Sequence, residues 1–232
     1  NLVSDGFCAG CNITGDGENN ILLGCCTGRS ITTGDQNIVL GKDSMDCATV
    51  TASNNIALGA NTLKCVTSGS ENVAIGANAL QCGLSIGCRN VAIGAMAGRK
   101  LQNNCNIAIG SNAGDALTSG YANVFIGKDA GGTVNSGYGN VFIGNKVGNG
   151  HTSQINSVAI GNFAYDGGSA NQVVCIGAYA GTNINSTAAV GDVFIGYDAG
   201  GANTEGAGNT GIGYEALKTN VDGDKNTAVG YQ

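Results

Sequence analysis

The sequence predicts an all-β protein, a single parallel β-solenoid of about 13–14 coils with roughly 17 residues per coil. Three observations lead to this prediction. A five-residue motif recurs along the whole chain, apolar residues alternate with period two inside each copy, and a glycine closes each copy. No linker interrupts the array, so we expect residues 1–232 to form one continuous repeat array with no separate domain and no capping domain.

The motif reads Asn-(Val/Ile/Thr)-x-(Ile/Leu/Val)-Gly, as in Asn72 to Gly76, and a weaker copy spans Leu2 to Gly6. The clear copies close at Gly24, Gly41, Gly59, Gly76, Gly94, Gly110, Gly127, Gly144, Gly161, Gly177, Gly196, Gly213 and Gly230.

Each copy predicts one short strand followed by a turn. The residue before the glycine and the residue two positions earlier are aliphatic or Thr, and they share one face of the strand. We expect this face to line a thin core, opposite a small residue that lies three positions after the glycine. That residue is most often alanine: Ala79, Ala97, Ala113, Ala130, Ala180, Ala199 and Ala216.

One such unit cannot bury its apolar face alone, whereas stacked units can. Coils spaced at about 4.8 Å would give a rod roughly 60 Å long. Equivalent side chains would then lie above one another in columns.

Composition excludes several classes of function. The net charge of −6 gives no electrostatic reason to bind nucleic acid, and no apolar run is long enough for membrane insertion. The single histidine, His151, lies in a glycine-rich loop, and carboxylates are scattered through turns. We therefore expect no enzymatic activity, no catalytic or metal-binding residues and no cofactor.

Ten cysteines are the main chemical feature, and most fall into columns. Stacked equivalent residues lie within the Cα separation that a disulfide accepts, which favours staples between coils in an oxidising, extracellular setting. The alternative is a ladder of free thiols. The expected pairs are Cys8 with Cys26, Cys88 with Cys105, and one pair among Cys47, Cys65 and Cys82.

A second, weaker interpretation of the first cysteines is a zinc site. Cys8 and Cys11 form a CxxC pattern and the vicinal pair Cys25-Cys26 follows. The vicinal pair is unusual for zinc, and the only histidine lies far along the chain.

The residue two positions before each glycine points away from the expected core face and never carries a charge. An outer face in water would carry Thr, Ser or Lys, so we interpret this column as a self-association stripe. Its largest members are Leu22, Val39, Phe125, Phe142 and Phe194.

Aromatic residues also repeat in register. Tyr197, Tyr214 and Tyr231 occupy one column and Tyr121 and Tyr138 another. An exposed tyrosine column could stack against the sugar rings of a cell-surface glycan, or it could only stabilise the solenoid. Two sequons, at Asn12 and Asn185, are glycosylation candidates in a secreted protein.

The repeats resemble the Asn-x-Val-Ala-Ile-Gly head repeats of trimeric autotransporter adhesins. The segments Asn209 to Asn220 and Asn226 to Gln232 are also similar to repeats of phage and giant-virus fibre proteins. The resemblance implies a left-handed parallel β-roll in an elongated, surface-exposed fibre that is often trimeric.

These features together predict a non-enzymatic structural fibre protein, extracellular or on a virion or cell surface, whose partner is itself. The chain begins inside a strand at Leu2 and stops two residues after Gly230, so we expect copies to stack end to end as well as laterally. The alternative is an adhesin or viral tail-fibre segment that binds a receptor or glycan. An ice-binding solenoid is a minor alternative, supported only by Thr49 and Thr51.

Overall fold

A computed structural model describes residues 2–13, 17–47, 49–83, 87–150 and 152–232. The chain divides into two compact units, 1–120 and 121–232, and each is described by itself. All regular structure in the described residues is β-strand, joined by turns and bends, and none is helical. Each unit is a parallel β-solenoid, which confirms the predicted fold class.

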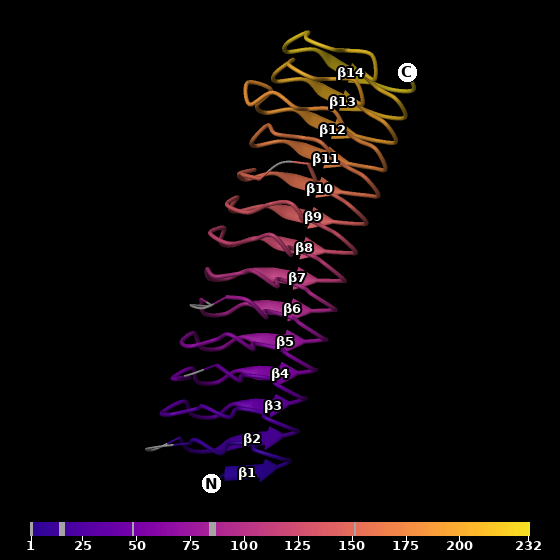
Figure 1. Cartoon of the computed structure of the whole chain (residues 1–232). Coiled ribbons are helices and arrows are strands. Elements are labelled where there is room, and N and C mark those ends of the chain that lie inside the picture. Colours follow the sequence, from indigo (N-terminus) through magenta and orange to yellow (C-terminus); the bar gives the residue numbers. More distant parts are fainter. Residues whose placement is uncertain (1, 14–16, 48, 84–86, 151) are drawn as a thin grey trace. The chain divides into compact units, whose positions relative to one another are not determined.

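In the first unit each strand pairs in parallel with the next strand along the chain (Figure 1). Its strands are β1 (Leu2–Asp5), β2 (Asn20–Leu23), β3 (Ile38–Leu40), β4 (Ile56–Leu58), β5 (Val73–Ile75), β6 (Val91–Ile93) and β7 (Ile107–Ile109).

The second unit repeats this arrangement. Its strands are β8 (Val124–Ile126), β9 (Val141–Ile143), β10 (Val158–Ile160), β11 (Val174–Ile176), β12 (Val193–Ile195), β13 (Thr210–Ile212) and β14 (Thr227–Val229). The register joins equivalent motif positions, so Val141, Phe142 and Ile143 lie beside Val158, Ala159 and Ile160.

The core faces of the strands are the reverse of those expected. From β2 to β13 the residue two positions before the closing glycine points inward, and its two neighbours in the strand point outward. Ala74, for example, is completely buried, whereas Val73 and Ile75 on either side are only partly buried. The predicted alanine column is buried and lies in the core, as expected for residues such as Ala79 and Ala97.

The regular spacing of the motif asparagines has a structural cause: their side chains form a column inside the coils. In the first unit the backbone N–H and the Nδ2 of Asn72 donate to Oδ1 of Asn55, at 2.9 and 3.1 Å. Asn90 donates to Oδ1 of Asn72 in the same way. Because each buried amide satisfies the next, the column is a continuous hydrogen-bond ladder that fixes the register of the coils.

Each closing glycine is required where one coil approaches the next. Gly76 has φ of +120°, and a Cβ on it would lie 2.7 Å from the carbonyl of Gly94 in the following coil. A side chain at this position would therefore collide with neighbouring backbone and also adopt a disfavoured conformation. The period of the glycines is thus set by the stacking of the coils.

Candidate functional site

The outward residues of the strands form an apolar face on each unit, here called the outer Ile/Val face. From β2 onward the two outward positions of every strand are Ile, Val or Leu, apart from Thr210 and Thr227, and none is fully buried. In the first unit the face consists of Ile21, Leu23, Ile38, Leu40, Ile56, Leu58, Val73, Ile75, Val91, Ile93, Ile107 and Ile109. In the second it consists of Val124, Ile126, Val141, Ile143, Val158, Ile160, Val174, Ile176, Val193, Ile195, Thr210, Ile212, Thr227 and Val229.

The predicted self-association stripe is wrong, because its residues lie in the core. All of its largest members are completely buried, and the ring of Phe142 stacks on that of Phe125 with centroids 5.4 Å apart. Alternation shows that a strand has two faces but does not show which one points inward. The narrow coil admits one large side chain per strand, beside the Asn ladder, which leaves the two β-branched residues outside. The stripe residues that lie inside are Leu22, Val39, Phe125, Phe142 and Phe194.

No protein-family model, curated protein or solved structure matches the chain. The resemblance to adhesin and viral fibre repeats stays a prediction.

The predicted tyrosine columns form stacked ladders in the second unit. The ring centroids of Tyr197 and Tyr214 lie 5.3 Å apart and those of Tyr214 and Tyr231 lie 5.0 Å apart, with interplanar angles of 12° and 7°. Tyr121 and Tyr138 stack in the same way at 4.9 Å and 2°. Because the rings cover one another's faces, the ladder presents ring edges and hydroxyl groups to solvent. This geometry does not favour the stacking of sugar rings on the faces of Tyr197 and Tyr214.

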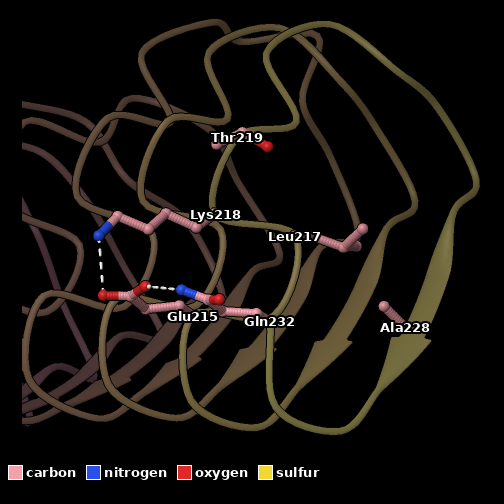
Figure 2. A pocket seen from close by; sticks show the side chains of 6 residues that line it. All are labelled: Glu215, Leu217, Lys218, Thr219, Ala228 and Gln232. Atoms are coloured by element: carbon pink, nitrogen blue, oxygen red, sulfur yellow. Dashed lines mark hydrogen bonds and ion pairs between the residues drawn. The ribbon is translucent and has the colours of Figure 1, made fainter.

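A charged clamp holds the residues that follow these tyrosines. Nζ of Lys218 lies 2.8 Å from carboxylate oxygens of both Asp198 and Glu215, and Nε2 of Gln232 donates to Glu215 at 2.9 Å. The hydrogen bond from Lys218, followed by that from Gln232, lowers the pKa of Glu215. Figure 2 shows Glu215, Lys218 and Gln232 lining a pocket of the last described coils, with Leu217 and Ala228 on the apolar side. The clamp links three successive coils.

The cysteines in the described residues are all free thiols, so no predicted disulfide is formed. The nearest thiol partner of Cys26 is its neighbour Cys25, with the sulfur atoms 3.6 Å apart, and the hydrogen bond with Cys25 is the main cause of the raised pKa of Cys26. The pKa of Cys8 is raised mainly by a hydrogen bond with Cys11.

The other predicted cysteine pairs lie in adjacent coils. The backbone N–H of Cys105 donates to the carbonyl of Cys88 at 3.1 Å. Cys47, Cys65 and Cys82 share one register, six positions after Gly41, Gly59 and Gly76. Burial, then the charges of Cys82 and Cys47, raises the pKa of Cys65.

One functional group that the sequence analysis missed is Asp192. It occupies an Asn-ladder position and is completely buried. Its Oδ1 accepts from the backbone N–H of Asn209 at 2.8 Å, and burial raises its pKa to about 6. The signal was visible in the motif, since the copy that closes at Gly196 begins with Asp instead of Asn.

The remaining sequence predictions concern the single histidine, the two sequons, metal binding and membrane insertion. His151 lies outside the described residues, as does Thr14 of the first sequon, while Asn12 and Asn185 are both exposed. Within the described ranges no group of three or more His, Cys, Asp or Glu side chains could hold a metal ion. No helix of the described chain is long and apolar enough to cross a membrane.

Proposed function

We propose that this protein is a structural fibre module without catalytic activity, and that its copies associate laterally through the outer Ile/Val face. The observation that carries the proposal is the composition of this face. From β2 to β7 in the first unit, and from β8 to β14 in the second, it contains no charged residue.

Exposing the outer Ile/Val face to water is unfavourable. A sheet with one face in water normally alternates apolar inward residues with polar outward ones. Here the outward residues Val141, Ile143, Val158 and Ile160 are all apolar and only partly buried. Each Å² of apolar surface that a partner removes from water contributes about 25 cal/mol of transfer free energy, which offsets part of the entropy lost on association. Columns of this kind therefore favour association.

The partner that fits this surface best is a second copy of the same chain. The face is a regular grid whose rows repeat at the strand spacing of about 4.8 Å. An identical grid has the same spacing, so the side chains of two copies can interdigitate along their length. A glycan would find no polar side chain on the face other than Thr210 and Thr227. Whether the assembly contains two, three or more copies, and whether copies also stack end to end, stay predictions.

We place the fibre outside the cell or on a virion or cell surface. The ten cysteines, with Cys47, Cys65 and Cys82 in one column, support an oxidising location in which stapled coils would resist unfolding. The exposed Asn185, in a sequon, is consistent with the same location.

The test is the mass of the assembly in solution. The chain has a mass of 22.9 kDa, and we expect the wild-type protein to sediment as a multiple of it. The double variant Val141→Lys/Ile143→Lys places two charges on the face and should sediment as a monomer with an unchanged circular dichroism spectrum. Thr187→Lys adds the same kind of charge in an exposed loop and should behave as the wild type. A monomeric wild-type protein, or a folded double variant that keeps its assembly mass, would contradict the proposal.

A further inference from the structure

The tyrosine ladder of the second unit combines close stacking with exposure to solvent, and the fibre proposal requires neither feature. Tyr197, Tyr214 and Tyr231 lie on successive coils, with centroid distances of 5.3 and 5.0 Å. All three are substantially exposed, from 42% for Tyr214 to 73% for Tyr231. A soluble oxidant can therefore reach each phenol, and each phenol has another at van der Waals distance.

We propose that Tyr197, Tyr214 and Tyr231 form an oxidative modification site, at which a peroxidase with hydrogen peroxide joins adjacent rings of one chain into dityrosine. Each of two phenols loses one electron and one proton from its hydroxyl group and becomes a phenoxyl radical. The radicals couple through a new carbon–carbon bond between the ring carbons next to the hydroxyl groups. The hydrogen on each coupled carbon then moves to its oxygen and restores the phenol. The pair has lost two hydrogen atoms in total, and one hydrogen peroxide is reduced to two waters.

The surroundings of Tyr214 support the first of these steps. The negative charge of Glu215 is the main cause of the raised pKa of Tyr214. The phenol therefore stays protonated until it is oxidised, and the nearby negative charge favours loss of the electron from the ring. Lys218 of the same coil and Gln232 of the following coil hold Glu215 in place (Figure 2).

The fold holds the two radicals together for the second step. The rings lie nearly parallel and must turn from face to face to edge to edge before they couple. Exposed side chains make such rotations on the picosecond-to-nanosecond timescale. The strand register keeps Tyr197, Tyr214 and Tyr231 in the same column, since β12 pairs with β13 and β13 with β14. Neighbours within one chain should therefore couple before two chains meet.

The second unit contains a second stacked tyrosine pair, which should also react, and a buried tyrosine, which should not. Tyr121 and Tyr138 stack at 4.9 Å and 2°, so they should couple under the same treatment. Tyr165 is completely buried, and its hydroxyl group donates to the carbonyl of Ala170. Tyr165 should stay unmodified.

The experiment treats the purified protein with peroxidase and hydrogen peroxide and maps tryptic peptides by mass spectrometry. Cleavage after lysine places Tyr197 and Tyr214 in peptide 147–218 and Tyr231 in peptide 226–232. We expect peptides 147–218 and 226–232 to be joined with the loss of two hydrogen atoms, and likewise peptides 101–128 and 129–146. Tyr214→Phe should remove the first cross-link and keep the second, and Tyr231→Phe should do the same.

A mixture of unlabelled and ¹⁵N-labelled protein distinguishes coupling within a chain from coupling between chains. Only light–light and heavy–heavy cross-links should appear. Failure to join peptides 147–218 and 226–232 would overturn the proposal, as would mixed-label cross-links or persistence of this cross-link in a folded Tyr214→Phe variant. The lateral-association proposal can fail without changing these results, because the Val141→Lys/Ile143→Lys variant can be oxidised in the same way.

Discussion

The buried carboxylate of Asp192 accepts a hydrogen bond of 2.8 Å at Oδ2 from the Nδ2 of Asn203, a residue of the loop that follows β12. Asn203 also donates to the carbonyl of Gly206 at 2.9 Å. In the regular coils the ladder asparagine makes this second kind of contact itself, as Asn72 does with the carbonyl of Gly87. Asn203 thus compensates for the loss of the amide donor at Asp192, and a charge is held inside the solenoid.

Asp192 should make the stability of the protein depend on pH. Burial raises its pKa from 3.8 to about 6, so the folded state binds this proton more tightly than the unfolded state does. Stability from this group is therefore fully present below pH ~4 and is lost as the pH rises through about 6. The Asp192→Asn variant has no such group. We expect the difference in Tm between Asp192→Asn and the wild type to shift in favour of the variant between pH 4 and pH 8, as measured by thermal denaturation. A difference that stays constant with pH would contradict this.

Removal of one ladder asparagine should be costly. Asn72→Ala leaves the buried backbone N–H of Asn90 and the carbonyl of Gly87 without their partners. Each unsatisfied buried group costs about 1–3 kcal/mol, so we expect the free energy of unfolding to fall by about 2–5 kcal/mol. Denaturant unfolding measures this loss.

Asn72→Ser is the matched control for the ladder. Serine occupies the equivalent position naturally at Ser157, whose backbone N–H donates to Oδ1 of Asn140 and whose Oγ accepts from the N–H of Val173 at 3.4 Å. Asn72→Ser should therefore cost less than Asn72→Ala. Equal losses would show that the ladder contributes through packing alone.

Phe142 should be a stability residue and not an interface residue. Its ring is completely buried against Phe125 and lies 6.1 Å from the ring of Tyr165. Phe142→Ala removes this packing and should cost about 3–5 kcal/mol. The outward neighbour Ile143, replaced by Ala, should cost markedly less. Equal losses in denaturant unfolding at a protein concentration that keeps the chain monomeric would contradict the assignment of the faces.

Cys175 should differ from the other cysteines in its reactivity. It is completely buried on β11, and burial, followed by the charge of Asp192, raises its pKa well above the usual range. Because the thiolate is the reactive form, iodoacetamide should not label Cys175 in the native protein. The exposed Cys82 is the control and should be labelled rapidly. Peptide mapping before and after denaturation gives both results, and native labelling of Cys175 would refute the prediction.

The disulfide pairing predicted from the sequence can be tested on oxidised material. Cys88 and Cys105 lie in adjacent coils joined by a backbone hydrogen bond, so they should pair when the protein is secreted through an oxidising compartment. Peptide mapping without reduction checks this pair, and Cys25 with Cys26 is a competing product because their sulfur atoms lie 3.6 Å apart. Ten free thiols in secreted material would contradict the proposed location.

The sequence by itself determined the fold class, the coil period and the position of every strand from β2 onward. The reason is redundancy: each motif copy carries the same asparagine, apolar alternation and glycine, so the copies align without any knowledge of long-range contacts. The alanine column and the stacked tyrosines followed from the same alignment, because equal positions in successive coils must lie side by side.

Only the tertiary structure decided which face of each strand points inward. Val141, Phe142 and Ile143 alternate in the same way whichever face is buried, and all three are apolar. The width of the coil settles the choice: the inward strand residue, the ladder asparagine Asn140 and buried turn residues such as Val147 fill it, so the two β-branched residues lie outside. The same three-dimensional information separates the buried Asp192 from the exposed carboxylates, because burial depends on the residues that surround a side chain and not on its own identity.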